Sequence, residues 1–542
     1  MHHAQTRHAT LFLLAVALFP VAKLASAAPN IVFILTDNQS ASALASYGNK
    51  DVHTPNIDEL AKSGVRFSHA YAASGMCSSS RATLMTGLMP SQHGLHNALY
   101  DSWVNSLNSG WNAVAEFRSL PLTLRNRGYQ TAMIGKWHLG DPHVPALGFE
   151  HWVALPYGHT LDFWDNELVE NGRHYSVKDQ HIVDVLASKA VDYISRANSK
   201  QPFFLQLNLD GPYALPPSNY GPARNQHYPR YAEQTFNSMP KEPISDEVLK
   251  RIDSPYIPGR NFDEVPLQEI WSHILYGTVR MQGDRTSYAN FLSQNSVVDD
   301  AVGLVVAALE ERDLMDNTVI IYSADQGNQF GQNGSWGHTI WFTPAHLHET
   351  SMHIPLIIKH PHGLAGTVSD RMIGQYDITT TLLSLAEIDE LTFERSPGRS
   401  FKGDLFEQEQ IKDWPEAAFF EQEESRGIRT RHYAYWKHID GMGEPVLYDM
   451  TTDADQHHNI YPSMKNSEIV RQLDHQLISF FTLYTNPKYD LWQSGTAKGT
   501  IPKPEIWLKR NPWQWMKKYW WDWLSRPQMD PVFSEQPAKA GV

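Results

Sequence analysis

The residues with the clearest chemical potential lie in the segment from Gly75 to Gly87, which reads GMCSSSRATLMTG. Cys77 is the single cysteine of the 542 residues, so it has no partner for a disulfide within the chain. A helix that begins near Cys77 would present unpaired backbone N–H groups and a positive dipole end, which suit a sulfate or phosphate group. Arg81, four residues on, falls on the same helix face and can hold residue 77 or an anion. The alternative is a buried, unreactive cysteine.

Polar side chains follow four apolar runs that have the composition of β-strands. The runs are Ile31–Leu35, Thr131–Ile134, Phe203–Leu209 and Thr318–Tyr322. The residues that follow them, in the same order, are Asp37 and Asn38, Lys136 and His138, Asp210 and Tyr213, and Asp325 and Gln326. Because binding sites in open α/β sheets form beyond the carboxyl ends of the strands, we expect these side chains to meet at one rim. The alternative is a set of solvated loop residues, since turns favour Asp.

The order of apolar runs and helical stretches predicts the fold class. A fifth run, Ile354–Ile358, also has strand composition, and the stretch Ser296–Arg312 places its apolar residues on one helical face. Alternation of strands and helices is typical of an α/β fold with a large, mostly parallel sheet covered by helices on both faces. We assign this α/β domain to residues 28–411.

The pattern changes after residue 411. Short strand-like pieces at Ala417–Glu421, Ile428–Trp436 and Val446–Asp449 precede a helix near Glu468–Tyr484. Residues 412–500 are therefore predicted to form a smaller α+β domain on a short antiparallel sheet. Residues 501–542 form a Trp-rich extension, in which a helix after Asn511 would dock on its own domain, stack on sugars or contact a membrane.

The N-terminus has the features of a secretory signal peptide over residues 1–27. Basic Arg7 precedes an apolar run from Leu11 to Val21, and Ala25-Ser26-Ala27 forms a cleavage site. The run contains Pro20 and falls short of the roughly 20 residues that a spanning helix needs. We therefore expect a secreted or periplasmic protein without a membrane-spanning segment.

Composition and charge limit the partners. Hydrophobic residues make up 42% of the chain and charged residues 19%, which is ordinary for a globular protein. The formal net charge is −14 at pH 7, which disfavours nucleic acid as a partner. An anionic substrate remains compatible, because a local basic or metal-bearing pocket can override the overall field.

The segment around Cys77 resembles the signature C-x-P-S-R of the type I sulfatases in the alkaline phosphatase superfamily, with Ser79 in place of the proline. The resemblance continues along the chain. The segment from Gly128 to His138, GYQTAMIGKWH, resembles the second signature of that family. Further similar blocks begin at Gln375 and Leu447. The family resemblance thus covers nearly the whole mature chain. Within the family, the sequence as a whole resembles the bacterial carbohydrate sulfatases.

The resemblance implies a specific reaction. In that family a maturation enzyme oxidises the cysteine, here Cys77, to formylglycine. One hydroxyl of the hydrated aldehyde attacks sulfur to form a covalent sulfate ester, and the other expels sulfate as the aldehyde reforms. By the same resemblance His138 is the base that takes the proton as the aldehyde reforms. Lys136 and Arg81 hold the formylglycine and the growing negative charge.

The resemblance also implies a calcium site, or sometimes a magnesium site. Its ligands would be Asp37, Asn38, Asp325 and Gln326, together with the oxygen of residue 77, since hard cations prefer oxygen ligands. The family usually has a second Asp where Asn38 stands and an Asn or His where Gln326 stands. With two formal negative charges from side chains, we expect a weaker site that still binds the cation.

Four residues are candidates on the substrate side. Tyr213 stands where such enzymes usually have a histidine, and His338 stands where they have a lysine. A protonated histidine can bind sulfate or donate a proton to the departing alcohol, so His338 is the predicted acid. His159 and Asp162 follow a segment that contacts the sulfated group in related enzymes, and they could bind sugar hydroxyls. A structural role is the alternative for each of them.

The sequence thus predicts a sulfatase that acts on a sulfated carbohydrate, such as a marine galactan of the carrageenan type. An aryl sulfate remains an open alternative. A phosphonate monoester or phosphodiester hydrolase of the same superfamily can share the formylglycine. The departures at Asn38, Ser79, Tyr213 and Gln326 motivate a third reading, a sulfated-glycan binding protein without catalysis.

Overall fold

The computed structural model describes most of the chain between residues 28 and 498. The described residues are 28–99, 110–156, 162–198, 200–214, 218–246, 248, 278–339, 342, 344–388, 395–406, 411 and 413–498. The predicted signal peptide, His159 and the Trp-rich extension lie outside this part of the chain.

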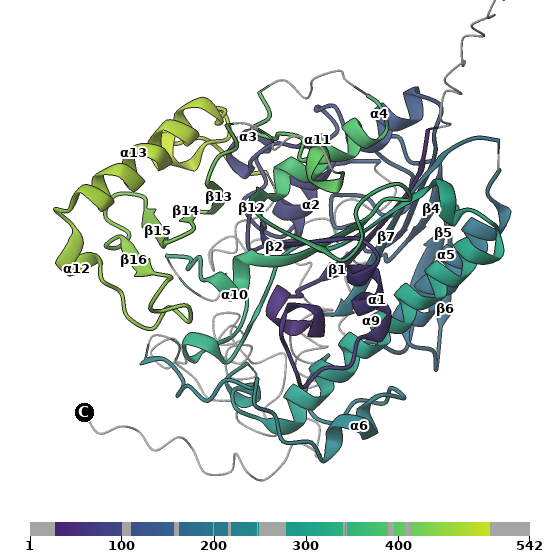
Figure 1. The fold of residues 1–542 in the computed structure, drawn as a ribbon, viewed down its shortest axis with the longest axis horizontal. Helices are drawn as coiled ribbons and strands as arrows, with labels where there is room; N and C mark the ends of the chain where they lie inside the picture. The colour runs from purple at the N-terminus through teal and green to yellow at the C-terminus, as the bar shows by residue number, and fades with distance from the viewer. Residues whose placement is uncertain are drawn as a thin grey trace, which may run out of the picture.

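A ten-stranded sheet forms the centre of the molecule (Figure 1). Its strands follow one another in the order β12-β2-β11-β8-β1-β7-β3-β4-β5-β6. Their bounds are β1 Asn30–Asp37, β2 Val65–Tyr71, β3 Gln130–Gly135, β4 His151–Ala154, β5 Asn166–Glu170, β6 Arg173–Val177, β7 Phe203–Pro212, β8 Thr318–Ala324, β11 His353–Lys359 and β12 Thr367–Gly374. The central strands β1, β7 and β8 are buried along their whole length, which explains their continuous apolar runs.

The four strands that carry predicted site residues are direct neighbours. In the order β8-β1-β7-β3 they all run parallel, with Ile31 opposite Phe204 and Val319 in the register. Their carboxyl ends therefore share one rim, as predicted. The sheet as a whole is mixed, because β11 runs antiparallel to both β8 and β2, and β5 runs antiparallel to β4 and β6.

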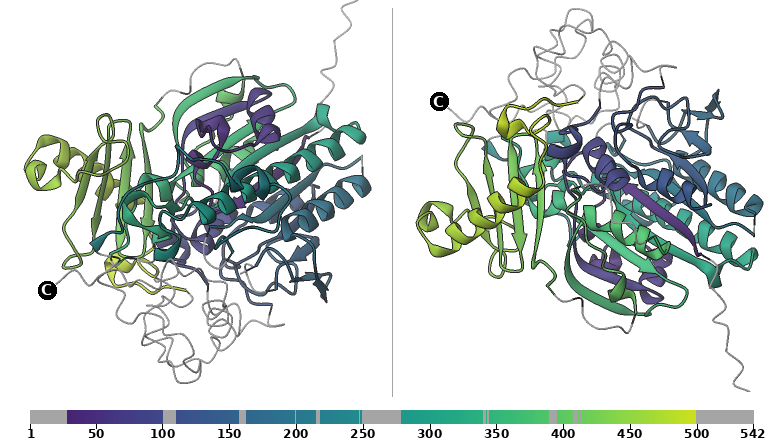
Figure 2. Two further views of the ribbon diagram at one scale, coloured as in Figure 1. Left: turned by 90° about the horizontal axis from the view of Figure 1, so that it is seen from below. Right: turned by 90° about the horizontal axis from the view of Figure 1, so that it is seen from above.

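Helices cover both faces of this sheet (Figure 2). One face packs against α1, α5 and α9, and the other packs against α2, α4 and α11. Their bounds are α1 Pro55–Lys62, α2 Cys77–Thr86, α4 Leu120–Asn126, α5 Ile182–Arg196, α9 Arg285–Glu311 and α11 Gln375–Leu385. The fold class predicted from the sequence, a large sheet sandwiched by helices, is confirmed.

Helix α9 is longer than the predicted stretch Ser296–Arg312. It begins at Arg285 because the Asp284 carboxylate accepts hydrogen bonds from the N–H groups of Thr286 and Ser287. Among the described residues α9 is also the helix whose length and apolar composition would suffice to cross a membrane. Of its most apolar window 72% is buried inside the protein, as in the core helix of a globular domain.

The C-terminal part forms a four-stranded antiparallel sheet, as predicted, with helix α13 on one face. Its elements are β13 Ala417–Gln422, β14 Ser425–Thr430, β15 Tyr433–His438, β16 Val446–Asp449 and α13 Glu468–Leu483. The single strand-like piece predicted at Ile428–Trp436 is wrong. It contains parts of β14 and β15, which pair across a turn at Arg431 and His432, and this turn has no Gly, Pro, Asn or Asp to mark it.

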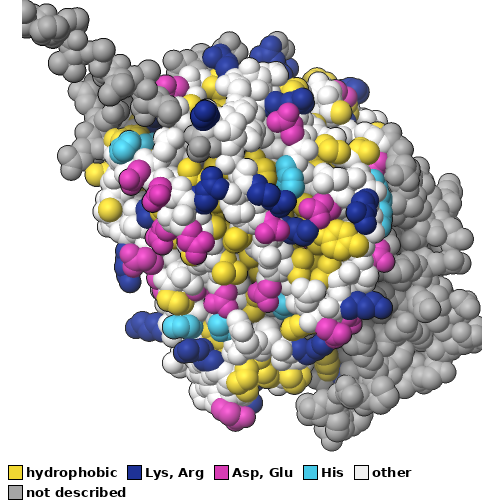
Figure 3. Space-filling model, turned by 90° about the vertical axis from the view of Figure 1, so that its right-hand side faces the viewer, with side chains coloured by type: hydrophobic (Ala, Val, Ile, Leu, Met, Phe, Trp, Pro, Cys, Tyr) yellow, Lys and Arg dark blue, Asp and Glu magenta, His cyan; other side chains and the backbone are white. Residues whose placement is uncertain are grey.

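The second face of this small sheet packs against the large domain. Phe420, Trp436 and Tyr448 belong to the same buried cluster as residues of the central sheet and of α2 and α11. Figures 1 and 2 accordingly show the small sheet beside the large domain. On the face drawn in Figure 3, basic, acidic and hydrophobic side chains are intermixed, and no single sign of charge prevails there.

Candidate active site

Cys77 is the first residue of α2, as the sequence predicts. Met76 precedes it in an extended conformation, and Gly87 ends the helix in a left-handed conformation. Every residue of the helix is buried, and Cys77 itself is 3% exposed. Gly75 permits the close approach of Thr339, because a Cβ at this position would lie 2.7 Å from the Thr339 methyl carbon. The reactive residue thus sits at a buried helix start.

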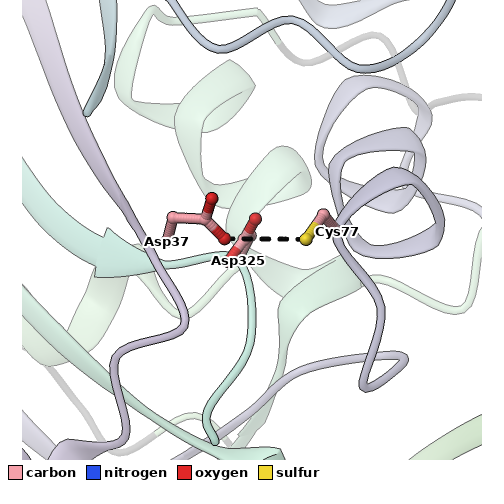
Figure 4. A group of neighbouring side chains, drawn as sticks. All are labelled: Asp37, Cys77 and Asp325. Carbon is pink, nitrogen blue, oxygen red and sulfur yellow. Dashed lines mark hydrogen bonds between the residues drawn. The ribbon is translucent and has the colours of Figure 1, made fainter. Parts of the chain in front are cut away.

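Two carboxylates face Cys77 from neighbouring strand ends (Figure 4). Asp37 ends β1 and Asp325 follows β8, and ligand atoms of these two residues and of Cys77 all lie within 4.8 Å of one another. The thiol lies 3.5 Å from Asp37 Oδ1. The Asp325 carboxylate also accepts hydrogen bonds from the backbone N–H groups of Asn38 and Gln326, at 3.2 and 2.8 Å. The strand rim therefore brings together three of the predicted ligands.

The amide side chains of Asn38 and Gln326 complete the predicted ligand set. Gln326 Nε2 donates to Asn38 Oδ1 and lies 3.1 Å from Cys77 Sγ. Gln326 Oε1 is buried, and it has no hydrogen-bond partner among the described residues. Buried polar oxygens without a partner are costly, and together with two carboxylates they suit a hard cation. The residues present thus fit a calcium or magnesium ion.

Lys136 and Arg81 pair with the two carboxylates. Lys136 Nζ lies 2.5 Å from Asp37 Oδ2, and both side chains are fully buried. Arg81 donates to Asp325 Oδ2 from Nε at 3.0 Å and from Nη2 at 2.8 Å. Its Nη1 donates to the backbone carbonyl of Lys136 at 3.1 Å. Both cations therefore lie beside Cys77 but are held by the carboxylates of the predicted cation site.

Burial and mutual charge shift the pKa values of this group. Burial, followed by repulsion from Asp325, raises the pKa of Asp37 to about 6. Burial and the Asp37 carboxylate raise the pKa of the Cys77 thiol well above its ordinary value. Burial alone would lower the pKa of Lys136, but the adjacent Asp37 carboxylate raises it. A divalent cation between Asp37 and Asp325 would relieve the repulsion between them.

The other predicted residues lie at different distances from this centre. His138 is buried at the exit of β3, and its backbone carbonyl accepts a hydrogen bond from Ser78, the neighbour of Cys77. His338 Nε2 lies 3.5 Å from Asn38 Nδ2. The Tyr213 ring lies 5.3 Å from Lys136 Nζ. The structure therefore places the side chains of His338 and Tyr213 beside a predicted ligand and a predicted cation, and the backbone of His138 beside the start of α2.

Asp162 has a structural partner. Its carboxylate accepts a hydrogen bond from the N–H of Trp164 at 2.9 Å, and its carbonyl accepts one from Asn166. This is the pattern of a turn that an Asp side chain stabilises. Its predicted contact with sugar hydroxyls stays a prediction, as does that of His159, which lies outside the described residues.

The family model described as Sulfatase matches residues 29–388, which is more than half of the chain. The chain belongs to the sulfatase family. A second model, described as N-sulphoglucosamine sulphohydrolase, C-terminal, matches residues 337–482 of this sulfatase and covers its small antiparallel sheet. The predicted enzyme class, a sulfuric ester hydrolase, is thereby confirmed.

Two curated relatives illustrate the likeness. This sulfatase is 26% identical over 496 residues to the N-acetylglucosamine-6-O-sulfatase of Bacteroides thetaiotaomicron, which covers 82% of this chain and 85% of the relative. It is 25% identical over 476 residues to the ulvan-active sulfatase of Formosa agariphila, with 83% and 80% covered. A solved complex of a protein with its substrate D-glucosamine-2-N,6-O-disulfate has 23% identity and a TM-score of 0.66. The structural match covers 85% of this chain and 99% of the other protein.

Two residues of this sulfatase to which the sequence patterns gave no role hold Asp325 in place. The Ser80 hydroxyl bonds to the backbone carbonyl of Asp325 and, at 2.6 Å, to Gln375 Oε1. Gln375 Nε2 donates to the same carbonyl at 2.9 Å. Both residues lie in blocks that resemble family signatures, which was the available signal. Their link to Asp325 could not be found, because it joins segments 245 and 50 residues apart.

Proposed function

We propose that this sulfatase releases inorganic sulfate from a sulfate ester on a carbohydrate, with Cys77 converted to formylglycine by a maturation enzyme. The supporting observation is the position of Cys77 at the start of α2, opposite two buried carboxylates and two buried cations. The Cys77 Sγ atom stands in for the formylglycine oxygen in this arrangement. When hydrated, formylglycine supplies two hydroxyls on one carbon, one for attack on sulfur and one for release.

The neighbouring side chains have distinct proposed roles. Arg81 and Lys136 orient the formylglycine and offset the negative charge that grows on the sulfate group. His138 takes the proton from the hydroxyl of residue 77 during release, and His338 donates a proton to the departing alcohol oxygen. The proximity of Arg81 and Lys136 to Cys77, through Asp325 and Asp37, supports their roles.

The resident cation in this proposal is Ca²⁺, with Mg²⁺ as the alternative. Asp37, Asn38, Asp325 and Gln326 would hold it together with the oxygen of residue 77. The cation would supply positive charge beside the sulfate group. The buried, unpartnered Oε1 of Gln326 and the two close carboxylates support this assignment.

The proposed substrate is a sulfated oligosaccharide or polysaccharide, and carrageenan is one candidate. Two relatives named for N-acetylglucosamine-6-O-sulfate and ulvan support a carbohydrate. Tyr213, His159 and Asp162 are the proposed sugar contacts. The signal-like N-terminus supports export to the periplasm or the medium, where polysaccharides are met.

A sulfate-release assay over a panel of sulfated oligosaccharides tests the proposal. We expect turnover by the native enzyme, loss of turnover with a chelator and recovery with calcium. Cys77→Ala should lose activity by about a thousandfold or more, because the nucleophile is gone. Cys77→Ser is the matched control. Its single hydroxyl can attack sulfur and release one equivalent of the alcohol, but it cannot expel the bound sulfate, so it should release no inorganic sulfate. Turnover that survives in Cys77→Ala would contradict the mechanism.

Two further experiments distinguish a sulfatase from a glycan-binding protein and from a phosphonate monoester hydrolase. Mass analysis of the peptide that holds Cys77 should show formylglycine in the native protein, whereas an unmodified thiol with retained glycan binding would favour a binding protein. Paired sulfate and phosphonate esters of one alcohol should be compared. Faster phosphonate cleavage would identify a phosphonate monoester hydrolase, and we expect faster sulfate release.

A further inference from the structure

The chain segment that leaves β3 is fixed at its first peptide groups. The Lys136 N–H donates to the Asn208 carbonyl at 3.0 Å, and Asn208 Nδ2 donates to the Lys136 carbonyl at 2.8 Å. Arg81 donates to the same carbonyl. Gly135 precedes this point with a positive φ of 114°, and a Cβ there would lie 1.9 Å from the Asn208 oxygen. The backbone of Lys136 is therefore held by hydrogen bonds at both its N–H group and its carbonyl group.

His138, two residues further on, has an unfavourable backbone conformation. Its φ is 59°, in the left-handed region that is uncommon for non-glycine residues, although His adopts it more often than most. Such a conformation costs on the order of 1 kcal/mol and persists only where the surroundings enforce it. Some contact must therefore hold the His138 backbone in this form.

Ser78 provides such a contact. Its hydroxyl donates to the His138 carbonyl at 2.8 Å and accepts a hydrogen bond from the Leu99 N–H at 3.0 Å. The Ser78 side chain is fully buried, so no bulk water competes for these bonds. The hydroxyl thus connects the first turn of α2, which carries Cys77, to the backbone of His138.

We infer that Ser78 is a positioning residue, whose hydroxyl fixes the backbone of His138 and thereby the place of the imidazole relative to residue 77. The inference rests on the proposed function, in which His138 moves a proton at residue 77. Proton transfer requires heavy atoms within about 3 Å, so a small displacement of the base lowers the rate steeply. In the proposed function His138 acts on release, after the covalent intermediate has formed, so displacing it should lower kcat and leave kcat/KM unchanged.

Ser79 offers a matched control one residue along the same helix. It is equally buried, but its hydroxyl has no hydrogen-bond partner among the described residues. A change to alanine at Ser78 or at Ser79 removes one buried oxygen from the same turn and from the same segment that the maturation enzyme would recognise. The two variants differ in whether the removed hydroxyl contacts His138.

The experiment compares native enzyme, Ser78→Ala and Ser79→Ala in steady-state sulfate release. Rates are divided by the fraction of folded protein that carries formylglycine, measured by mass spectrometry, so that poor maturation cannot imitate a loss of rate. Ser78→Ala should lower kcat at least tenfold and keep kcat/KM within twofold, because the release step follows the formation of the covalent intermediate. Ser79→Ala should keep kcat within twofold. If the Ser78→Ala protein does not fold, Ser78→Thr takes its place. This variant retains the hydroxyl, so it should keep most of the native kcat.

A His138→Ala background distinguishes positioning from general support of the fold. If Ser78 acts through His138, the double variant should release sulfate in a single turnover less than threefold more slowly than His138→Ala alone. The inference is overturned if Ser78→Ala keeps the native kcat, if KM rises in place of a fall in kcat, or if the tenfold loss recurs in the His138→Ala background. Absence of sulfate release by native, formylglycine-bearing enzyme would instead contradict the proposed function.

Discussion

At the reactive centre, four charged side chains are buried as two pairs. Asp37 pairs with Lys136, and Asp325 pairs with Arg81. Buried pairs contribute little net stability, because desolvation offsets their attraction. In the proposed function these pairs provide preorganisation, since charges fixed before the reaction would need no rearrangement when the sulfate group gains negative charge. The same arrangement makes the centre sensitive to any added or removed carboxylate.

Asn38→Asp tests this sensitivity with opposite effects in two conditions. The new carboxylate adds a negative ligand, so calcium affinity should rise by roughly tenfold. Without a cation, a third carboxylate beside Asp37 and Asp325 repels both, so the protein should melt at a lower temperature. The measurement is thermal unfolding in chelator and over a series of free calcium concentrations. Asn38 already has a φ of 57°, which Asp tolerates, so backbone strain is matched.

Asn38→Ala serves as the control in that series, because it removes a ligand and should weaken calcium binding. A melting temperature for Asn38→Asp that exceeds the native value in chelator would contradict the assignment of this cluster as a cation site.

Ser79→Ala should stabilise the protein. The Ser79 hydroxyl is buried without a hydrogen-bond partner among the described residues, and burial of such a group costs about 1–3 kcal/mol. We expect the free energy of unfolding to rise by about 1 kcal/mol, measured as a higher urea midpoint with an unchanged slope. Ser80→Ala is the comparison, because the Ser80 hydroxyl bonds to Gln375 and Asp325 and its loss should lower stability. A lower midpoint for Ser79→Ala would count against this account.

At the scale of the elements, the start of α5 depends on a neutral histidine. His181 Nδ1 accepts a hydrogen bond from the Val183 N–H, and its Nε2 lies 2.8 Å from Gln294 Oε1. The imidazole must therefore carry its proton on Nε2. Burial lowers the pKa of His181 from 6.5 to about 4, and the hydrogen bond with Gln294 only partly opposes this. A protonated His181 could no longer accept from Val183, so the cap would be lost.

This cap predicts a pH dependence with a definite sign. The pKa of His181 is lower in the folded state than in the unfolded state, so its contribution is fully present above pH 6.5 and is lost as the pH falls through about 4. His181→Asn keeps an N-cap that does not titrate. Between pH 7 and pH 4 the native protein should lose roughly 3 kcal/mol more of its free energy of unfolding than His181→Asn does. Denaturant unfolding across this pH range measures the difference, and parallel pH profiles would contradict it.

At the scale of the whole molecule, a partly buried ion pair between Glu349 and Arg429 joins the two domains. Glu349 begins helix α10, Glu349–Met352, and accepts from Tyr71 Oη at 2.8 Å and from Arg429 Nε of β14 at 2.9 Å. Burial would raise the pKa of Glu349, but Arg429 lowers it below its ordinary value. The small sheet also shares a buried apolar cluster with the large domain through Phe420 and Trp436. The two domains should therefore unfold together.

Arg429→Met tests whether this ion pair couples the unfolding of the two domains. It keeps an unbranched side chain but leaves the partly buried Glu349 carboxylate without its cation, which should cost about 2–3 kcal/mol. Calorimetry should show one transition at a lower temperature. Arg431→Met is the matched control two residues away, because Arg431 makes more exposed ion pairs with Glu416 and Asp370 and should cost less than about 1 kcal/mol. Two separate transitions in the native protein, or equal costs for both variants, would show that the domains are independent.

The sequence by itself determined most of the elements and which side chains lie at the candidate site. Strand runs have a local composition, and polar residues at their ends are visible without coordinates. For this reason the rim with Asp37 and Asp325, and the helix that begins at Cys77, could be predicted. The piece Ile428–Trp436, predicted as one strand, shows the limit of this reasoning, because the turn at Arg431 and His432 contains no Gly, Pro, Asn or Asp to mark it.

Only the tertiary structure decided which side chains act on one another. Ser78 and His138 are 60 residues apart, and Glu349 and Arg429 are 80 residues apart. Such hydrogen bonds depend on strand register, on loop paths and on the left-handed turn at His138, and none of these leaves a periodic trace in the sequence. Local patterns specify what each element offers, whereas a contact between distant segments exists only once packing has fixed their relative positions.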